Sequence, residues 1–164
     1  VLDLDNTLWG GIIGGDGFDN IKLGDNPVGR TFVEFQKRLL ALNQRGILLA
    51  INSKNNFNDA IEVIQKHPSM ILKEDNFASV KINWNDKVTN LQKIAVELNI
   101  GLDSIVFFDD DKVNRDFIIS ILPEVLTVEM PKDPSQYVPT LLELNDFNDY
   151  LFIQPLFDVY FTCI

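Results

Sequence analysis

The chain has 164 residues, which suits one globular domain and is short for two. Hydrophobic residues make up 46% of it, enough to bury a core, and this excludes global disorder. The net charge of −10 argues against partners that attract clustered cations, namely nucleic acids and anionic membranes. No apolar run approaches the roughly 20 residues of a membrane-spanning helix. The single cysteine, Cys163, allows no internal disulfide, so we expect a cytoplasmic protein.

The first part of the chain predicts a strand, a flap and a helix. Residues 1–4 form a short apolar strand, and because the chain opens inside it we expect a piece of a longer protein. Seven glycines within residues 9–29 predict a hairpin or flap and no helix. Apolar residues at spacings of three and four predict an amphipathic helix over 32–43.

The remainder alternates strands with helices. We expect further strands at 47–51, 70–72, 79–82, 105–108 and 125–128. We expect further helices at 58–66, 86–98, 114–122 and 140–144. This alternation predicts an α/β fold, a Rossmann-like three-layer sandwich with a mostly parallel sheet. We assign residues 1–149 to this domain and interpret 150–164 as an apolar tail or the start of a linker.

Acidic residues follow two of the predicted strands. Asp3 and Asp5 end the first strand, and Asp109 and Asp110 follow the strand at 105–108. The carboxyl ends of parallel strands meet at one edge of a sheet, where ligands bind. Carboxylates crowded there repel one another unless a cation or protons intervene, and oxygen ligands suit Mg²⁺. We therefore predict a Mg²⁺ site formed by these four residues.

Other polar residues at the same edge suit phosphoryl chemistry. Ser53 follows a buried strand and can donate a hydrogen bond to a phosphoryl oxygen, and Lys87 can supply positive charge. Both have simpler interpretations, Ser53 as a helix cap and Lys87 as a surface lysine. We predict that Lys54, Asn55 and Asn56 bind substrate, although asparagines also suit turns.

The flap bears on which substrates can enter. It is too short for a large cap domain, so we expect a capless site that could admit a carrier protein. A flap from Gly10 to Gly24, with Trp9 at its root, could instead cover a small substrate. Trp9 and Trp84 both suit core packing, and we predict Trp9 to be the one that contacts substrate.

These residues resemble the four motifs of the haloacid-dehalogenase-like (HAD) phosphatase superfamily. The first motif corresponds to Asp3–Thr7, and Ser53, Lys87 and the Asp109–Asp110 pair follow after gaps of 50, 34 and 22 residues. The resemblance implies that Asp3 is a nucleophile that becomes an aspartyl-phosphate and that Asp5 is the general acid and base. It implies that Ser53 and Lys87 hold the phosphoryl group. It also implies that Mg²⁺ is held by Asp3, the main-chain carbonyl of Asp5, and Asp109 or Asp110.

Longer stretches resemble the FkbH-like group of this superfamily. They include residues 3–11, 53–56, 82–87 and 98–104. The resemblance implies a phosphorylated glycerate as substrate, with possible glyceryl transfer to an acyl carrier protein. The sequence departs from the group at Asn52, where many relatives carry cysteine, and in the loop after Asp110. A plain phosphatase of small metabolites or phosphoproteins, and a binding module without turnover, are the alternatives.

Overall fold

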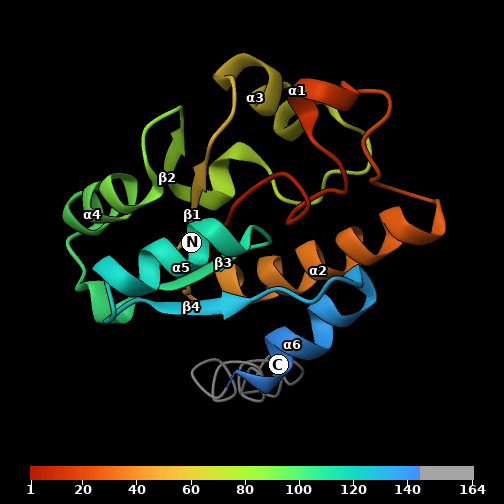
Figure 1. Ribbon diagram of the computed structural model, residues 1–164. Helices are drawn as coiled ribbons and strands as arrows, with labels where there is room; N and C mark the ends of the chain where they lie inside the picture. The colour runs from red at the N-terminus through yellow and green to blue at the C-terminus, as the bar shows by residue number, and fades with distance from the viewer. Residues whose placement is uncertain (145–164) are drawn as a thin grey trace, which may run out of the picture.

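A parallel β-sheet lies at the centre of the computed structural model, which describes residues 1–144 (Figure 1). Strand β1 (Leu49–Ser53) pairs with β2 (Phe77–Ile82), and β3 (Val106–Asp109) pairs with β4 (Leu126–Glu129). The start of the chain joins the two pairs, because Leu2 forms parallel bridges to Ile51 and to Phe108. The order across the sheet is therefore β2, β1, the segment 1–3, β3 and β4.

Helices cover both faces of this sheet. Adjacent residues of a strand point to opposite faces, and Phe107 and Phe108 of β3 show which helices lie on each. Phe107 packs in the cluster formed by α4 (Lys87–Leu98) and α5 (Lys112–Ile121). Phe108 contacts Phe35 of α2 (Pro27–Gln44), with ring centroids 6.1 Å apart, and α3 (Phe57–Lys66) and α6 (Tyr137–Glu143) belong to the same cluster. The predicted three-layer α/β sandwich is confirmed.

Two helices begin earlier than predicted because of their caps. Helix α2 starts at Pro27, since the Asn26 side chain accepts a hydrogen bond from the Gly29 amide at 2.6 Å. Helix α5 starts at Lys112, since the Asp111 carboxylate caps it. The predicted flap over 9–29 therefore ends at residue 26. Helix α6 likewise starts at Tyr137 rather than at 140, directly after the turn of 3₁₀ helix over Pro134–Gln136.

The flap contains a helical turn, so the prediction of a flap without helix is wrong. Gly10 and Lys22 exchange backbone hydrogen bonds of 3.0 and 2.7 Å, which is the expected hairpin-like pairing. Between them lies α1 (Ile13–Asp16), whose own Asp16 carboxylate accepts from the Ile12 amide. Figure 1 shows α1 beside α3, at one end of the sheet.

The strand predicted at 70–72 is absent from the structure. The Gln36 side chain of α2 accepts hydrogen bonds from the Ile71 and Leu72 amides, at 2.9 and 3.1 Å. It also donates to the Leu8 carbonyl at 2.7 Å. The backbone here is thus satisfied by a buried side chain instead of a neighbouring strand. Two further turns of 3₁₀ helix are Glu74–Asn76 and Leu102–Ser104.

Within residues 1–144, no helix combines the length and the apolar character needed to cross a bilayer. The predicted tail at 150–164, with Cys163, lies outside the described residues.

Candidate active site

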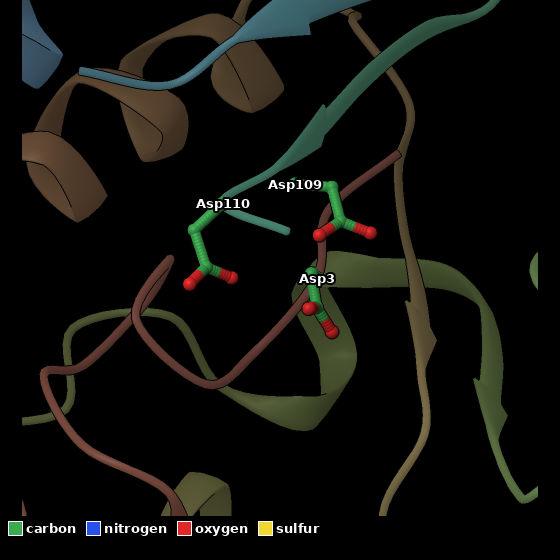
Figure 2. A group of neighbouring side chains, drawn as sticks. All are labelled: Asp3, Asp109 and Asp110. Carbon is green, nitrogen blue, oxygen red and sulfur yellow. The ribbon is translucent and has the colours of Figure 1, made fainter. Parts of the chain in front are cut away.

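Three carboxylates meet at the carboxyl end of the sheet (Figure 2). Asp3 comes from the N-terminal segment, and Asp109 and Asp110 come from the end of β3. One oxygen of each lies within 4.8 Å of the others. Asp3 and Asp109 are buried, and Asp110 is not. The parallel pairing of Leu2 with Phe108 places these acids side by side, as the sequence predicts.

Lys87 neutralises part of this charge from the first turn of α4. Its Nζ lies 2.8 Å from Asp3 Oδ2 and 2.5 Å from Asp109 Oδ2, and the residue is only 3% exposed. Burial opposes the charged ammonium, but the two carboxylates outweigh burial and raise the pKa of Lys87. The interpretation of Lys87 as a surface lysine is therefore wrong.

The second oxygen of Asp3 has no hydrogen-bond partner among the described residues, although it is buried. Burial raises the pKa of Asp109 to about 6, and the charge of Asp3 adds to this. Burial also raises the pKa of Asp110, again with a contribution from Asp3. One lysine thus faces three carboxylates, one of which has a free oxygen. Such an excess of oxygen ligands and negative charge fits a divalent cation such as Mg²⁺.

The Asp5 carboxylate points away from this cluster, toward the flap. It accepts hydrogen bonds from Trp9 Nε1, the Ile13 amide and Asn55 Nδ2, at 2.9, 3.0 and 3.1 Å. Burial raises the pKa of Asp5, although these hydrogen bonds oppose the shift. Asp5 therefore differs from Asp3 and Asp109: its side chain lies outside the carboxylate cluster and is held by neutral donors instead of Lys87.

A cavity of about 530 Å³ opens over these acids, and we call it the catalytic cavity. Its polar lining residues are Asp3, Asp5, Asn6, Ser53, Lys54, Asn55, Asn56, Lys87, Asp110, Asp111 and Asn114, and Ile12, Gly14 and Trp84 complete it. The structure thus brings together Ser53, Lys54, Asn55 and Asn56 with the acids, while their roles remain predictions. Ser53 Oγ accepts from Asn55 Nδ2 at 3.1 Å, and Lys54 Nζ lies 3.3 Å from Asn114 Oδ1.

The structure places the two tryptophans the opposite way from the prediction, with Trp9 in the core and Trp84 at the cavity. Trp9 is 0% exposed and is absent from the cavity lining, so its predicted contact with substrate is wrong. Its indole Nε1 instead donates to Asp5 Oδ1. Trp84, interpreted as a packing residue, is 70% exposed at the cavity rim, where Nε1 donates to Asn56 Oδ1 at 3.1 Å.

Asn6 and Asn114 also line the cavity and were not predicted. The backbone of Asn6 is left-handed, with φ of 51°. Its side chain accepts from the Gly11 amide at 2.8 Å, and its carbonyl accepts from the Tyr137 hydroxyl at 2.7 Å. An asparagine directly after the second acid was the one sequence signal for this turn.

Asn52 supports α4 rather than the cavity. It is fully buried, its Nδ2 donates to the Lys87 carbonyl at 2.9 Å, and its Oδ1 accepts from Asn90 Nδ2 at 3.1 Å. It does not line the catalytic cavity. In this fold, the residue before Ser53 holds the turn that presents Lys87.

Comparison with solved structures links this geometry to known proteins. One match is the N-terminal part of a protein from Bacteroides fragilis, described as containing a phosphatase domain complexed with Mg. The two chains are 43% identical with a TM-score of 0.85, over 88% of this chain and 39% of the other. This chain therefore spans well under half of that relative.

A second match, an uncharacterized protein from Corynebacterium glutamicum, is 12% identical with a TM-score of 0.54. It covers 86% of this chain and 89% of its own, and it shows the fold alone. No family model and no curated protein matches the chain. The comparisons thus agree with an α/β, Rossmann-like fold.

Proposed function

We propose that the chain is a Mg²⁺-dependent phosphatase or phosphotransferase of the HAD type, with Asp3 as its nucleophile. The observation that carries this proposal is the free, buried oxygen of Asp3, at the centre of an acidic cluster and in a cavity that also presents Lys87. The similarity to a phosphatase domain complexed with Mg supports it.

The residues that would hold Mg²⁺ are Asp3, Asp109, Asp110 and the main-chain carbonyl of Asp5. The cation supplies positive charge that lets an anionic phosphate approach the carboxylates and stabilises the charge of the transition state. The side chains of Asp3, Asp109 and Asp110 form the cluster, and the Asp5 side chain is not part of it. The Asp5 carboxylate would therefore not be bound to the cation and could transfer protons.

In the first step, an Asp3 carboxylate oxygen attacks phosphorus and forms an aspartyl-phosphate. The bond between phosphorus and the ester oxygen breaks, and protonated Asp5 donates its proton to that leaving oxygen. Burial, which raises the pKa of Asp5, favours this proton. Lys87 and Ser53 contact the phosphoryl oxygens as the negative charge on them shifts.

In the second step, water attacks the same phosphorus. Asp5, now a carboxylate, accepts the proton of the water, the bond to Asp3 breaks, and inorganic phosphate leaves. An acceptor hydroxyl in place of water makes the reaction a phosphotransfer. The hydrogen bonds from Trp9, Ile13 and Asn55 hold the Asp5 carboxylate for both proton transfers.

For the substrate, we propose a phosphorylated glycerate, with glyceryl transfer to an acyl carrier protein by a longer protein of which this chain is the phosphatase part. The resemblance to the FkbH-like group and the small flap support this proposal, because a short flap leaves room for a large partner. A plain phosphatase is the second candidate. It is favoured because residues 1–144 contain no cysteine to form a thioester.

The test is Mg²⁺-dependent phosphate release from a panel of phosphomonoesters that includes the phosphoglycerates. We expect Asp3→Asn to abolish release and Asp5→Asn to slow it by about 10²–10⁴-fold. Asp103→Asn, an exposed acid outside the cavity, is the matched control and should keep full activity. Release that persists in Asp3→Asn contradicts the nucleophile. Mg²⁺ binding without release from any ester would favour the binding module.

A further inference from the structure

A second recess adjoins the catalytic cavity, and we call it the Trp84 recess. It has a volume of about 490 Å³ and shares Asn55, Asn56 and Trp84 with the catalytic cavity, so these three residues border both hollows. Its other walls come from the first turn of α3 and from the loop after β2. The proposed phosphoryl chemistry uses none of these outer walls.

The recess presents a tryptophan ring that is exposed and yet held in place. Trp84 Nε1 donates to Asn56 Oδ1 at 3.1 Å, and Asn56 Nδ2 donates to Asp59 Oδ2 at 3.2 Å. These two hydrogen bonds link Trp84 to Asn56 and Asn56 to Asp59. The orientation of the indole is therefore set by α3, which begins after Asn56. An indole that is 70% exposed but oriented by a side-chain hydrogen bond provides a flat surface for a ligand.

The chemistry of the lining indicates what the recess would accept. Besides Trp84 and Phe57, it carries the amides of Asn56, Asn58 and Asn83 and the carboxylate of Asp59. Each amide both donates and accepts hydrogen bonds, as hydroxyl groups also do. The recess contains no lysine or arginine, whereas the catalytic cavity has Lys54 and Lys87. A negative group is therefore disfavoured in the recess and favoured in the cavity.

We propose that the Trp84 recess binds the end of the substrate distant from its phosphate, and that it selects an uncharged, hydroxyl-bearing group which packs against Trp84. This inference rests on the proposed phosphatase function and adds a specificity residue to it. It favours the second candidate, a plain phosphatase, because a phosphorylated glycerate would place a carboxylate beside Asp59. The phosphoryl group lies over Asp3 and Lys87. The neutral end then extends past Asn55 and Asn56, the residues that belong to both compartments.

A matched set of phosphomonoesters tests the proposal. Glycerol 3-phosphate is short and neutral at its far end, sorbitol 6-phosphate is long and neutral, and 6-phosphogluconate has the same length but ends in a carboxylate. We expect sorbitol 6-phosphate to have a higher kcat/KM than 6-phosphogluconate. We expect Trp84→Ala to lower kcat/KM for sorbitol 6-phosphate by about ten-fold more than for glycerol 3-phosphate.

Two further variants separate binding from structure. Trp84→Phe keeps an aromatic face and should recover much of the discrimination, and Phe117→Ala removes an exposed aromatic of α5 outside both recesses and should change nothing. An equal loss for both neutral esters in Trp84→Ala, or a preference for 6-phosphogluconate, would overturn the proposal.

Fluorescence provides a test that does not depend on turnover. The chain has two tryptophans, and Trp9 is buried, so acrylamide quenching reports on Trp84. In Asp3→Asn, sorbitol 6-phosphate should protect Trp84 from quenching and glycerol 3-phosphate should not. Equal protection by both esters, or protection by neither, refutes the recess. If the wild type releases no phosphate, the proposed function fails, and the quenching result still decides on the recess.

Discussion

Replacing Lys87 by methionine should lower the free energy of unfolding more than any surface substitution does. The change removes the ammonium that lies 2.8 Å from Asp3 and 2.5 Å from Asp109, and it leaves both carboxylates in place. The side chains of Lys87 and Asp109 are 3% and 0% exposed, so water hydrates the two carboxylates only poorly once the ammonium is lost. Removing one member of a buried ion pair costs about 3–5 kcal/mol of unfolding free energy.

For a domain of this size, that loss corresponds to a melting temperature lower by about 10 °C. The assay is urea and thermal unfolding in EDTA, repeated with Mg²⁺. Because a cation bound to the folded state can supply the missing positive charge, Mg²⁺ should stabilise Lys87→Met more than the wild type. At a concentration one hundred times its Kd, Mg²⁺ would raise the free energy of unfolding by about 2.7 kcal/mol.

Lys81→Met is the matched control, because Lys81 pairs with Glu97 at the surface and should cost at most about 1 kcal/mol. Equal losses of unfolding free energy in Lys87→Met and Lys81→Met would refute the reasoning. Such a result would mean that the carboxylates are protonated or hydrated in the folded protein, and that the cluster needs no cation.

Three other changes test separate parts of the structure. Mg²⁺ should raise the melting temperature of the wild type but not of an Asp109→Asn/Asp110→Asn double variant, and equal stabilisation of both would place the metal elsewhere. Gln36→Leu should lower the unfolding free energy by about 3 kcal/mol in urea titrations, because it leaves three buried backbone groups without partners, and a loss below 1 kcal/mol would contradict this. Burial raises the pKa of Tyr137 to about 12, so this hydroxyl contributes stability that is complete below its ordinary pKa of about 10 and is lost as the pH rises through 12. Tyr137→Phe should remove that alkaline decline in unfolding free energy, and an unchanged decline would show that other groups cause it.

The order of strands and helices could be predicted because hydrophobic spacing is a local property. At residues 70–72, where the predicted strand is absent, a contact between distant residues decides the structure. Nothing in residues 70–72 shows that Gln36 would satisfy the amides of Ile71 and Leu72. The helix starts at Pro27 and Lys112 were also missed, although Asn26 and Asp111 are local caps that the sequence itself contains.

The candidate site shows the same division. The grouping of Asp3 with Asp109 and Asp110 follows from one rule, that parallel strands end at a common edge. The two tryptophans could not be distinguished in this way, because both lie in loops without periodicity. Whether an indole is covered depends on what packs over it. Trp9 is buried and donates to Asp5, four residues before it, whereas Trp84 is exposed and donates to Asn56, from another loop.

The central position of the N-terminal segment has a consequence for folding. Leu2 is held between Ile51 and Phe108, so this segment is inserted between strands that follow it at long range in the sequence. Such long-range pairing closes large loops and is slow, since the entropy is lost before the contacts form. Asp3 therefore reaches Lys87 and Asp109 only when both halves of the sheet are assembled. A partly folded chain lacks the complete acidic cluster, and the appearance of Mg²⁺ binding during refolding would mark the last step.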